Sequence, residues 1–174
     1  MQVEESTVRH LRITGADRLD PISVTLQDFG PGQGKIVIDV WGEAWACYWG
    51  SMGEKHTISS FFQKASTGYL AEKLAPNLAR SRFSNEKLQR AAKKEILLAR
   101  RFDEISHAKA RDLFDDVEFR LENVETLNDC GHHDSFMSSV FGGNWMESVG
   151  HGDIHEPNPP YTYLCRVIEA VKAG

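Results

Sequence analysis

The chain has 174 residues, of which 41% are hydrophobic and 26% are charged, and its formal net charge is -5 at pH 7. A chain of this length favours a single domain that buries roughly 70% of its unfolded surface, so it needs no disulfide framework. It has no run of about 18 apolar residues, which excludes a transmembrane helix, and its first ten residues lack the apolar core of a secretory signal. Three widely spaced cysteines agree with a reducing, cytoplasmic setting.

The first third of the chain alternates apolar and polar residues as β-strands do. Ile22, Val24 and Leu26 share one face of a predicted strand, and the Gly30-Pro31-Gly32 sequence that follows suits a type II turn. We predict a four-stranded antiparallel meander within residues 1–53. Its strands are expected at residues 7–14, from residue 22 to the turn at 30–32, at 35–41 and at 44–49.

After Gly53 the spacing of apolar residues becomes helical. Hydroxyl residues stand where helix N-caps are expected, at Thr57, Ser84 and Ser106. Pro76 is expected to end a short helix, because proline cannot continue the hydrogen-bond ladder. The predicted helices begin near residues 57, 69, 84, 106 and 161, and the third of them continues to about residue 102.

Residues 129–160 are rich in Gly, His, Asn and Pro, a composition typical of loops. The fold class that we predict is therefore α+β, as one domain over residues 1–174. In it, the N-terminal antiparallel β-meander of about four strands (residues 1–53) packs against C-terminal helices from residues 54–174. The polar loop at 129–160 is expected to cover one edge or to project outward.

Trp41, Trp45 and Trp49 lie close together in the sequence, with Tyr48 beside them. On an open sheet face they would form a stacking platform for the bases of single-stranded nucleic acid. Under a layer of helices they would fill the core, where such rings bury about 150–250 Å² each. Because the chain has many helical segments after residue 57, we favour the core interpretation.

The glycine-rich segment from Gly30 to Lys35 superficially resembles a phosphate-binding loop. A P-loop places GxxxxGK and a hydroxyl residue at the start of a helix, where backbone amides meet the phosphate. Here the spacing is one residue short, Ile36 stands at the hydroxyl position, and a predicted strand follows. A hairpin turn is therefore the favoured interpretation.

Charge is unevenly distributed, with a basic stretch near residues 80–101 and an acidic stretch near 112–134. The predicted basic helix 86–101 presents our candidate partner-binding residues, Lys87, Arg90, Lys94 and Arg101. Such a helix would bind an acidic protein surface or a phosphate backbone. The simpler alternative is a solvated helix face that pairs with the acidic segment, for example at Asp112, Asp115 and Asp116.

A metal site is weakly indicated by one cysteine and several histidines in the polar segment. Zinc prefers thiolate and imidazole ligands, and a His-x-x-x-His spacing is acceptable for it. Only one cysteine is present there, and the gap between the histidine pairs is long, so no cofactor is expected and zinc is the alternative. The candidate ligands are Cys130, His133, His151 and His155.

A catalytic function has no motif to support it. Neither GxSxG nor HExxH nor a Walker sequence is present, so no catalytic residue is nominated and the interpretation leans against an enzyme.

Several strings along the chain stand out together: LDPI at 19–22, DFGPGQG at 28–34, AW at 44–45, YWG at 48–50, Met52, YLA at 69–71 and YTYLCR at 161–166. They resemble a group of small proteins encoded by tailed bacteriophages and prophages. The resemblance spans most of the chain and implies a setting, the cytoplasm of a bacterial host cell, but no enzyme activity and no functional residues.

Three functions follow from these observations. We expect a non-enzymatic phage or prophage accessory protein that binds and modulates a bacterial protein complex, with inhibition of a defence system as one such activity. The first alternative is a nucleic-acid-binding protein that uses helix 86–101 or the tryptophan-bearing sheet face. The second is a zinc-stabilised module or a metal-dependent enzyme. No membrane partner is expected, and the sequence does not indicate an oligomeric state.

Overall fold

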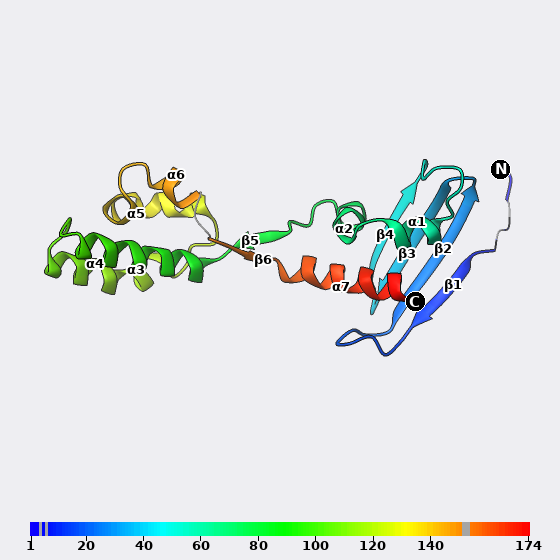
Figure 1. Ribbon diagram of the computed structural model, residues 1–174, viewed down its shortest axis with the longest axis horizontal. Coiled ribbons are helices and arrows are strands. Elements are labelled where there is room, and N and C mark those ends of the chain that lie inside the picture. The colour runs from blue at the N-terminus through cyan, green and yellow to red at the C-terminus, as the bar shows by residue number, and fades with distance from the viewer. Residues whose placement is uncertain (4, 6, 151–153) are drawn as a thin grey trace. The chain divides into compact units, whose positions relative to one another are not determined.

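The structure is a computed structural model that describes residues 1–3, 5, 7–150 and 154–174. It divides into two compact units (Figure 1). The sheet unit comprises Met1–Arg80 and Asn158–Gly174, and the helical unit comprises Ser81–Pro157. Each unit has its own cluster of buried hydrophobic side chains. The helical unit is thus an insertion into the chain of the sheet unit.

Four antiparallel strands form the sheet, in the order β1-β2-β3-β4. This arrangement confirms the predicted N-terminal meander. It also confirms the α+β fold class, because the four strands come first in the chain and the elements after them are mainly helices. The strands are β1 (Arg9–Ile13), β2 (Ile22–Gly30), β3 (Gln33–Val40) and β4 (Glu43–Trp49). Ile38 of β3 is paired with Val24 on one side and with Trp45 on the other, so the apolar sets of the strands share one face.

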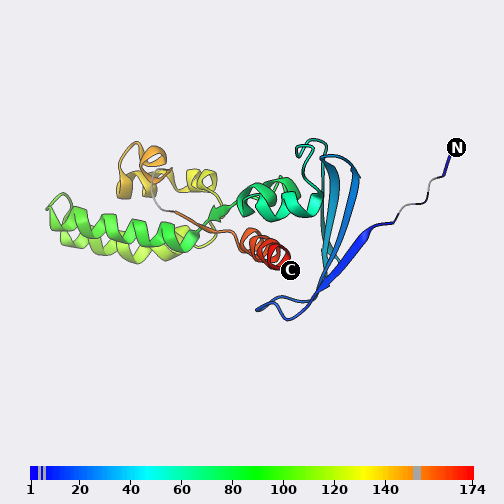
Figure 2. The ribbon, with the colours of Figure 1, turned by 45° about the vertical axis from the view of Figure 1, so that its right-hand side comes forward.

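Three helices cover that apolar face of the sheet (Figure 2). They are α1 (Ile58–Lys64), α2 (Thr67–Leu74) and α7 (Pro159–Ala173). Thr57 caps α1 as predicted, since its hydroxyl accepts from the Ser60 amide and the Ser60 hydroxyl accepts from the Thr57 amide. Among the described residues of the sheet unit, no helix lies on the opposite face of the sheet (Figure 2).

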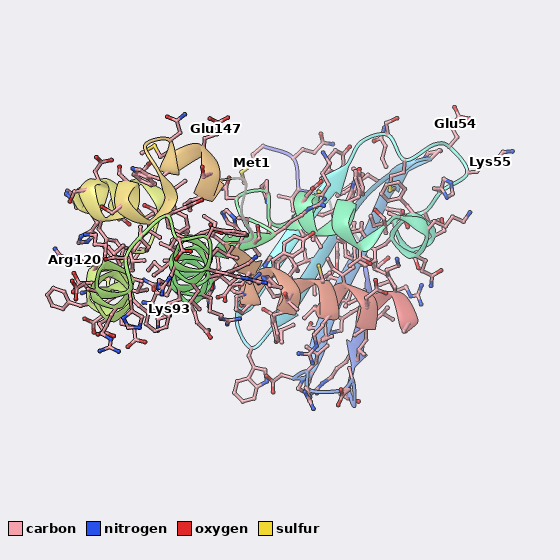
Figure 3. All side chains as sticks on the ribbon, turned by 60° about the vertical axis from the view of Figure 1, so that its left-hand side comes forward. Met1, Glu54, Lys55, Lys93, Arg120 and Glu147 are labelled. Atoms are coloured by element: carbon pink, nitrogen blue, oxygen red, sulfur yellow. The ribbon has the colours of Figure 1, made fainter. Side chains whose placement is uncertain are left out.

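The helical unit is built around an antiparallel pair of helices that Figure 3 shows nearly end-on, with α5 lying across them. Ser84 and Ser106 cap the two long helices as predicted, each accepting from the amide three residues later. The elements are β5 (Ser81–Phe83), α3 (Asn85–Arg101), α4 (His107–Leu121), the 3-10 helix η1 (Leu127–His133), α5 (Asp134–Phe141), α6 (Trp145–Gly150) and β6 (His155–Pro157).

A two-stranded ribbon closes the helical unit. Strands β5 and β6 pair antiparallel, with Arg82 opposite Glu156. The carboxylate of Glu156 accepts from the Arg82 guanidinium at 2.7 Å and from the Ser84 hydroxyl at 3.1 Å, and these bonds lower the pKa of Glu156 below its usual value. The carboxylate therefore joins β6 to the N-cap of α3.

The prediction that residues 129–160 are mostly loop is wrong. This segment contains most of η1 and all of α5 and α6. Phe136, Met137, Trp145 and Val149 are buried there, and apolar burial offsets the poor helix propensity of the surrounding glycines and asparagines. The helices α5 and α6 are only eight and six residues long, so the apolar residues repeat too few times for their helical spacing to be recognised in the sequence.

Candidate functional site

The glycine-rich segment joins two strands and positions helix α1. Gly32 has a φ of 68°, as the predicted turn requires, and strand β3 follows it rather than a helix. The Ile58 amide at the start of α1 donates to Asp28 Oδ1 at 2.7 Å. A Cβ on Gly34 would lie 2.7 Å from the Ile58 Cβ, so only glycine lets α1 approach the sheet so closely. The DFGPGQG string therefore has a structural role.

The tryptophans divide between the core and the surface. Trp45 and Trp49 are buried beneath the helices, as predicted, and the Trp49 indole N–H donates to the Tyr69 hydroxyl at 3.0 Å. Trp41 is 81% exposed, so the core prediction is wrong for this residue. Its position explains the difference, since Trp41 stands in the turn between β3 and β4 and not within either strand.

The candidate metal ligands are not brought together where the structure describes them. Cys130 is fully buried, and desolvation, with the nearby Asp129 carboxylate, raises the pKa of its thiol to about 11. His133 is half-buried at the start of α5, and His155 is exposed on β6. His151 lies outside the described residues. Within the described part of the chain, no three His, Cys, Asp or Glu residues are grouped in a way that could hold a metal ion.

The basic helix is α3, and its two sides differ. Leu88, Ala92 and Ile96 are buried toward the core of the helical unit. Lys93 Nζ forms an ion pair with Glu118 of α4 at 2.6 Å and lies 5.2 Å from the centre of the Phe114 ring. Figure 3 labels this lysine. Asp116, suggested above as a partner of the basic helix, instead pairs with Arg120 of its own helix.

The other side of α3 forms one wall of a groove with a volume of about 1040 Å³. Three of the four candidate partner-binding residues, Lys87, Arg90 and Lys94, line it. They recur at helical spacing along one side of α3, so the helix itself aligns their charges. Arg101 is exposed but does not line the groove. The structure therefore brings together three of the four residues.

The floor and the far wall of the groove combine apolar side chains with Ser138, Ser139 and Ser148. α3 and the turn after it contribute Leu98, Phe102 and Ile105, and α5 contributes Val140 and Phe141. Phe102 is 68% exposed, although it is one of the largest apolar side chains of the unit. Sequence reasoning missed this apolar surface, because its residues belong to separate elements that only tertiary packing brings together.

The three cationic side chains at the groove, Lys87, Arg90 and Lys94, differ in their hydrogen bonds and ion pairs. Lys87 Nζ donates to the backbone carbonyl of His155 at 2.6 Å, which fixes it against β6. Arg90 pairs with Glu86 one turn earlier on α3, at 2.6 Å and with both side chains exposed. Among the described residues, Lys94 has no hydrogen bond or ion pair. Lys94 is therefore the cation that is most available to a ligand.

Two carboxylates partly offset the positive charge of the groove. They belong to Glu95 and Glu104, which also line it. The groove is consequently basic along α3 and mixed near the end of that helix. It can hold an apolar surface whose anionic groups meet Lys94 and Arg90 and whose cationic groups meet the glutamates.

Comparisons with known proteins place the whole chain in a family. The model of the Phage_phiTE_072 family, described as a phage family, matches residues 1–174. The chain belongs to this phage family. That assignment confirms the resemblance to phage-encoded small proteins that the sequence strings indicated.

The other two comparisons give no match. No curated protein matches the chain, and no solved structure matches it. Among the described residues, none of the helices has both the length and the apolar character that crossing a membrane requires.

Proposed function

We propose that this phage-family protein is a non-enzymatic accessory protein that acts in the cytoplasm of the bacterial host. It binds an acidic, amphipathic segment of a bacterial protein complex in the groove between α3 and α5 and thereby modulates that complex. Inhibition of a bacterial defence complex is one activity of this kind. The observation that carries the proposal is the groove itself, in which cationic side chains border apolar ones.

The dimensions of the groove suit a short helix. Lys87 and Lys94 are seven residues apart on α3, which is about 10 Å along the helix axis. An amphipathic helix with acidic residues at the same spacing would meet both cations while its apolar side rests on Phe102 and Phe141. In this mode of binding, the acidic residues of the ligand helix contact the cations of α3, and its apolar residues contact the apolar side chains of the groove.

A phosphate backbone fits the groove less well than an acidic protein segment. Nucleic-acid binding sites place cations along the phosphate backbone and add aromatic rings that stack on bases. Here Glu95 and Glu104 would repel phosphate, and the apolar side chains of the groove would remain without a partner. The groove therefore favours a protein ligand over the nucleic-acid alternative that the basic helix suggests.

The first test is capture of a partner from nuclease-treated bacterial lysate by wild-type protein and by two charge-reversal variants. The groove variant is Arg90→Glu with Lys94→Glu. Its matched control is Lys55→Glu with Lys109→Glu, which changes the net charge equally at exposed residues that do not line the groove. We expect the groove variant to weaken the captured complex at least tenfold and the control to leave it unchanged. Equal weakening by both variants would contradict the proposal.

The second test identifies the segment that occupies the groove. A photoreactive phenylalanine analogue replaces Phe102, which lines the groove, or Phe119, which is 77% exposed on α4 and does not. We expect the partner to cross-link at position 102 and not at position 119, through a segment whose acidic residues recur every three to four positions. A cross-linked segment that is basic or lacks apolar residues would contradict the proposed recognition.

A further inference from the structure

Trp41 occupies a backbone position that disfavours it. It forms, with Gly42, the two-residue turn between Val40 and Glu43, and both turn residues have positive φ, 53° and 87°. This is the type I′ geometry of tight hairpins, for which Asn and Gly are strongly preferred at the first position. A bulky residue there is strained, because its Cβ crowds the backbone.

Burial does not compensate for this strain. The Trp41 side chain is 81% exposed, the largest exposed fraction of any aromatic residue described. Backbone strain at an exposed, bulky residue is a feature of functional sites, where the side chain makes a contact that the isolated protein does not contain. The position of Trp41 therefore points to a ligand that uses the indole ring.

A surface hollow of about 450 Å³ lies beside the indole. His10 and Arg12 of β1 line it together with Pro21 and Ser23 at the start of β2. His10 is held in place by a 3.4 Å hydrogen bond between Nδ1 and the Thr25 hydroxyl. Arg12 has no ion pair among the described residues, so its guanidinium is available to an anion.

The hollow opens onto the sheet face that the helices leave uncovered. Along β4 this face presents the small exposed side chains of Ala44 and Ala46. At its far end the exposed Phe29 and Tyr48 rings pack edge to face, 5.8 Å apart, and Lys35 is paired with Tyr48. The distance from Trp41 to this end, six residues of β3, is about 20 Å. The face thus has aromatic rings at both ends.

The charge of this face is net positive. Arg12 and Lys35 are the cations named on it, and Asp39, half-buried next to Ser23 on the neighbouring strand, is the carboxylate beside them. A carboxylate in such a position accepts hydrogen bonds from the amino groups of bases. Cations that border aromatic rings are the combination by which proteins bind single-stranded nucleic acid.

We propose that the uncovered sheet face binds single-stranded nucleic acid, with one base stacked on Trp41 and the adjoining phosphate bound by Arg12 and His10. This binding is independent of the groove in the helical unit, and it uses one tryptophan instead of a platform of three. A protein partner is the other occupant that an exposed tryptophan beside an arginine attracts, and the experiment distinguishes the two.

The experiment measures fluorescence anisotropy of labelled 15-residue oligothymidine and oligouridine with the full chain at low salt. Wild-type protein should bind with micromolar affinity and lose affinity as salt rises, because phosphate contacts release counterions. Trp41→Asn should weaken binding at least tenfold and should unfold at an equal or higher urea concentration, since asparagine accepts positive φ. Arg12→Gln should reduce the salt dependence.

The matched control is Phe119→Asn, which removes a comparably exposed aromatic ring from α4 and should leave oligonucleotide binding unchanged. Capture of the lysate partner by Trp41→Asn should also be unchanged, so failure of this proposal is distinct from failure of the groove proposal. Absence of oligonucleotide binding by wild-type protein, or equal binding by Trp41→Asn, would overturn the proposal. So would a loss of lysate partner in Trp41→Asn, which would identify the face as a protein-docking surface.

Discussion

The sheet unit and the helical unit are stabilised in different ways. In the sheet unit, the apolar face of alternating strands packs against three helices, and Ile22, Ile36 and Ile38 are completely buried. In the helical unit, α3 and α4 depend also on long-range polar contacts. Asn85 Nδ2, for example, donates to the carbonyls of Leu121 and Val124. The comparison teaches that local alternation specifies the first unit, whereas the second depends on a few long-range polar contacts in addition to its own apolar core.

The two units also differ in how their surfaces relate to ligands. The helical unit offers a concave groove that contains apolar side chains, and the sheet unit offers an uncovered sheet face with aromatic rings. A groove encloses a folded segment, whereas an open sheet face accommodates an extended strand whose bases stack on the rings. The two proposed ligands follow from this difference in shape as much as from charge.

The largest expected effect tests the role of burial in the sheet unit. Ile38→Ala should reduce the free energy of unfolding by about 3 to 4 kcal/mol, because Ile38 is fully buried and the change leaves a cavity. Val37→Ala, on the uncovered face of the same strand, should cost less than about 1 kcal/mol. Urea unfolding of both variants measures the difference, and similar losses would show that the two faces are equally packed.

A smaller effect tests the polar contacts of the helical unit. Asn85→Ala should cost about 2 kcal/mol, because it removes the amide that donates to the Val124 carbonyl and to the Leu121 carbonyl, which among the described residues then keeps only the 3.4 Å bond from Gln89 Nε2. Asn128→Ala, at an exposed residue of η1, is the control and should be nearly neutral. Hydrogen exchange should detect the loss in α3 and α4 but not in β2 and β3. Uniform loss over both units would contradict their separate stabilisation.

The smallest expected effect is the pH dependence that Cys130 contributes. Its folded-state pKa, about 11, lies above the ordinary thiol value, so this contribution to stability is complete below about pH 9 and is lost as pH rises toward 11. At pH 10 the loss should be about 1.4 kcal/mol, the equivalent of one pKa unit. Comparing urea unfolding of wild-type and Cys130→Ala protein between pH 8 and 11 measures it, and identical pH profiles would rule it out.

The sequence was sufficient for the parts of the fold that local patterns specify. Strand alternation revealed β2 and β3, and Thr57, Ser84 and Ser106 marked helix starts correctly because an N-cap depends on nearby backbone groups. The alternation of β3 also indicated where Trp41 lies. Val40 faces the core, so the next residue is expected to face the uncovered side of the sheet, and the prediction that placed Trp41 in the core did not take this into account.

The apolar half of the groove could not be predicted in this way. Phe102 and Phe141 are 39 positions apart in the printed sequence, and they line one groove only because α5 lies across α3. The basic half, Lys87, Arg90 and Lys94, was predicted because a single helix aligns it. Residues that a single helix aligns can be predicted from the sequence to lie together. Residues that only tertiary packing brings together cannot.

The chain crosses between the units at two adjacent points of the sheet unit. The Asn158 amide donates to the Arg80 carbonyl at 3.1 Å, and the Asn158 side chain donates to the Ala79 carbonyl at 2.8 Å. Insertions whose ends meet in this way are tolerated by the surrounding fold. An Asn-Gly turn between Arg80 and Asn158 would therefore replace residues 81–157 without moving β2, β3 or α7.

Excision of the helical unit tests most directly our claim that each unit has its own binding surface. The measurement is made on one shortened chain, residues 1–80 joined to 158–174 through Asn-Gly. This chain should unfold cooperatively, bind oligothymidine as tightly as the full protein, and capture none of the lysate partner. A shortened chain that is unfolded, that loses oligonucleotide binding, or that still captures the partner would contradict the account.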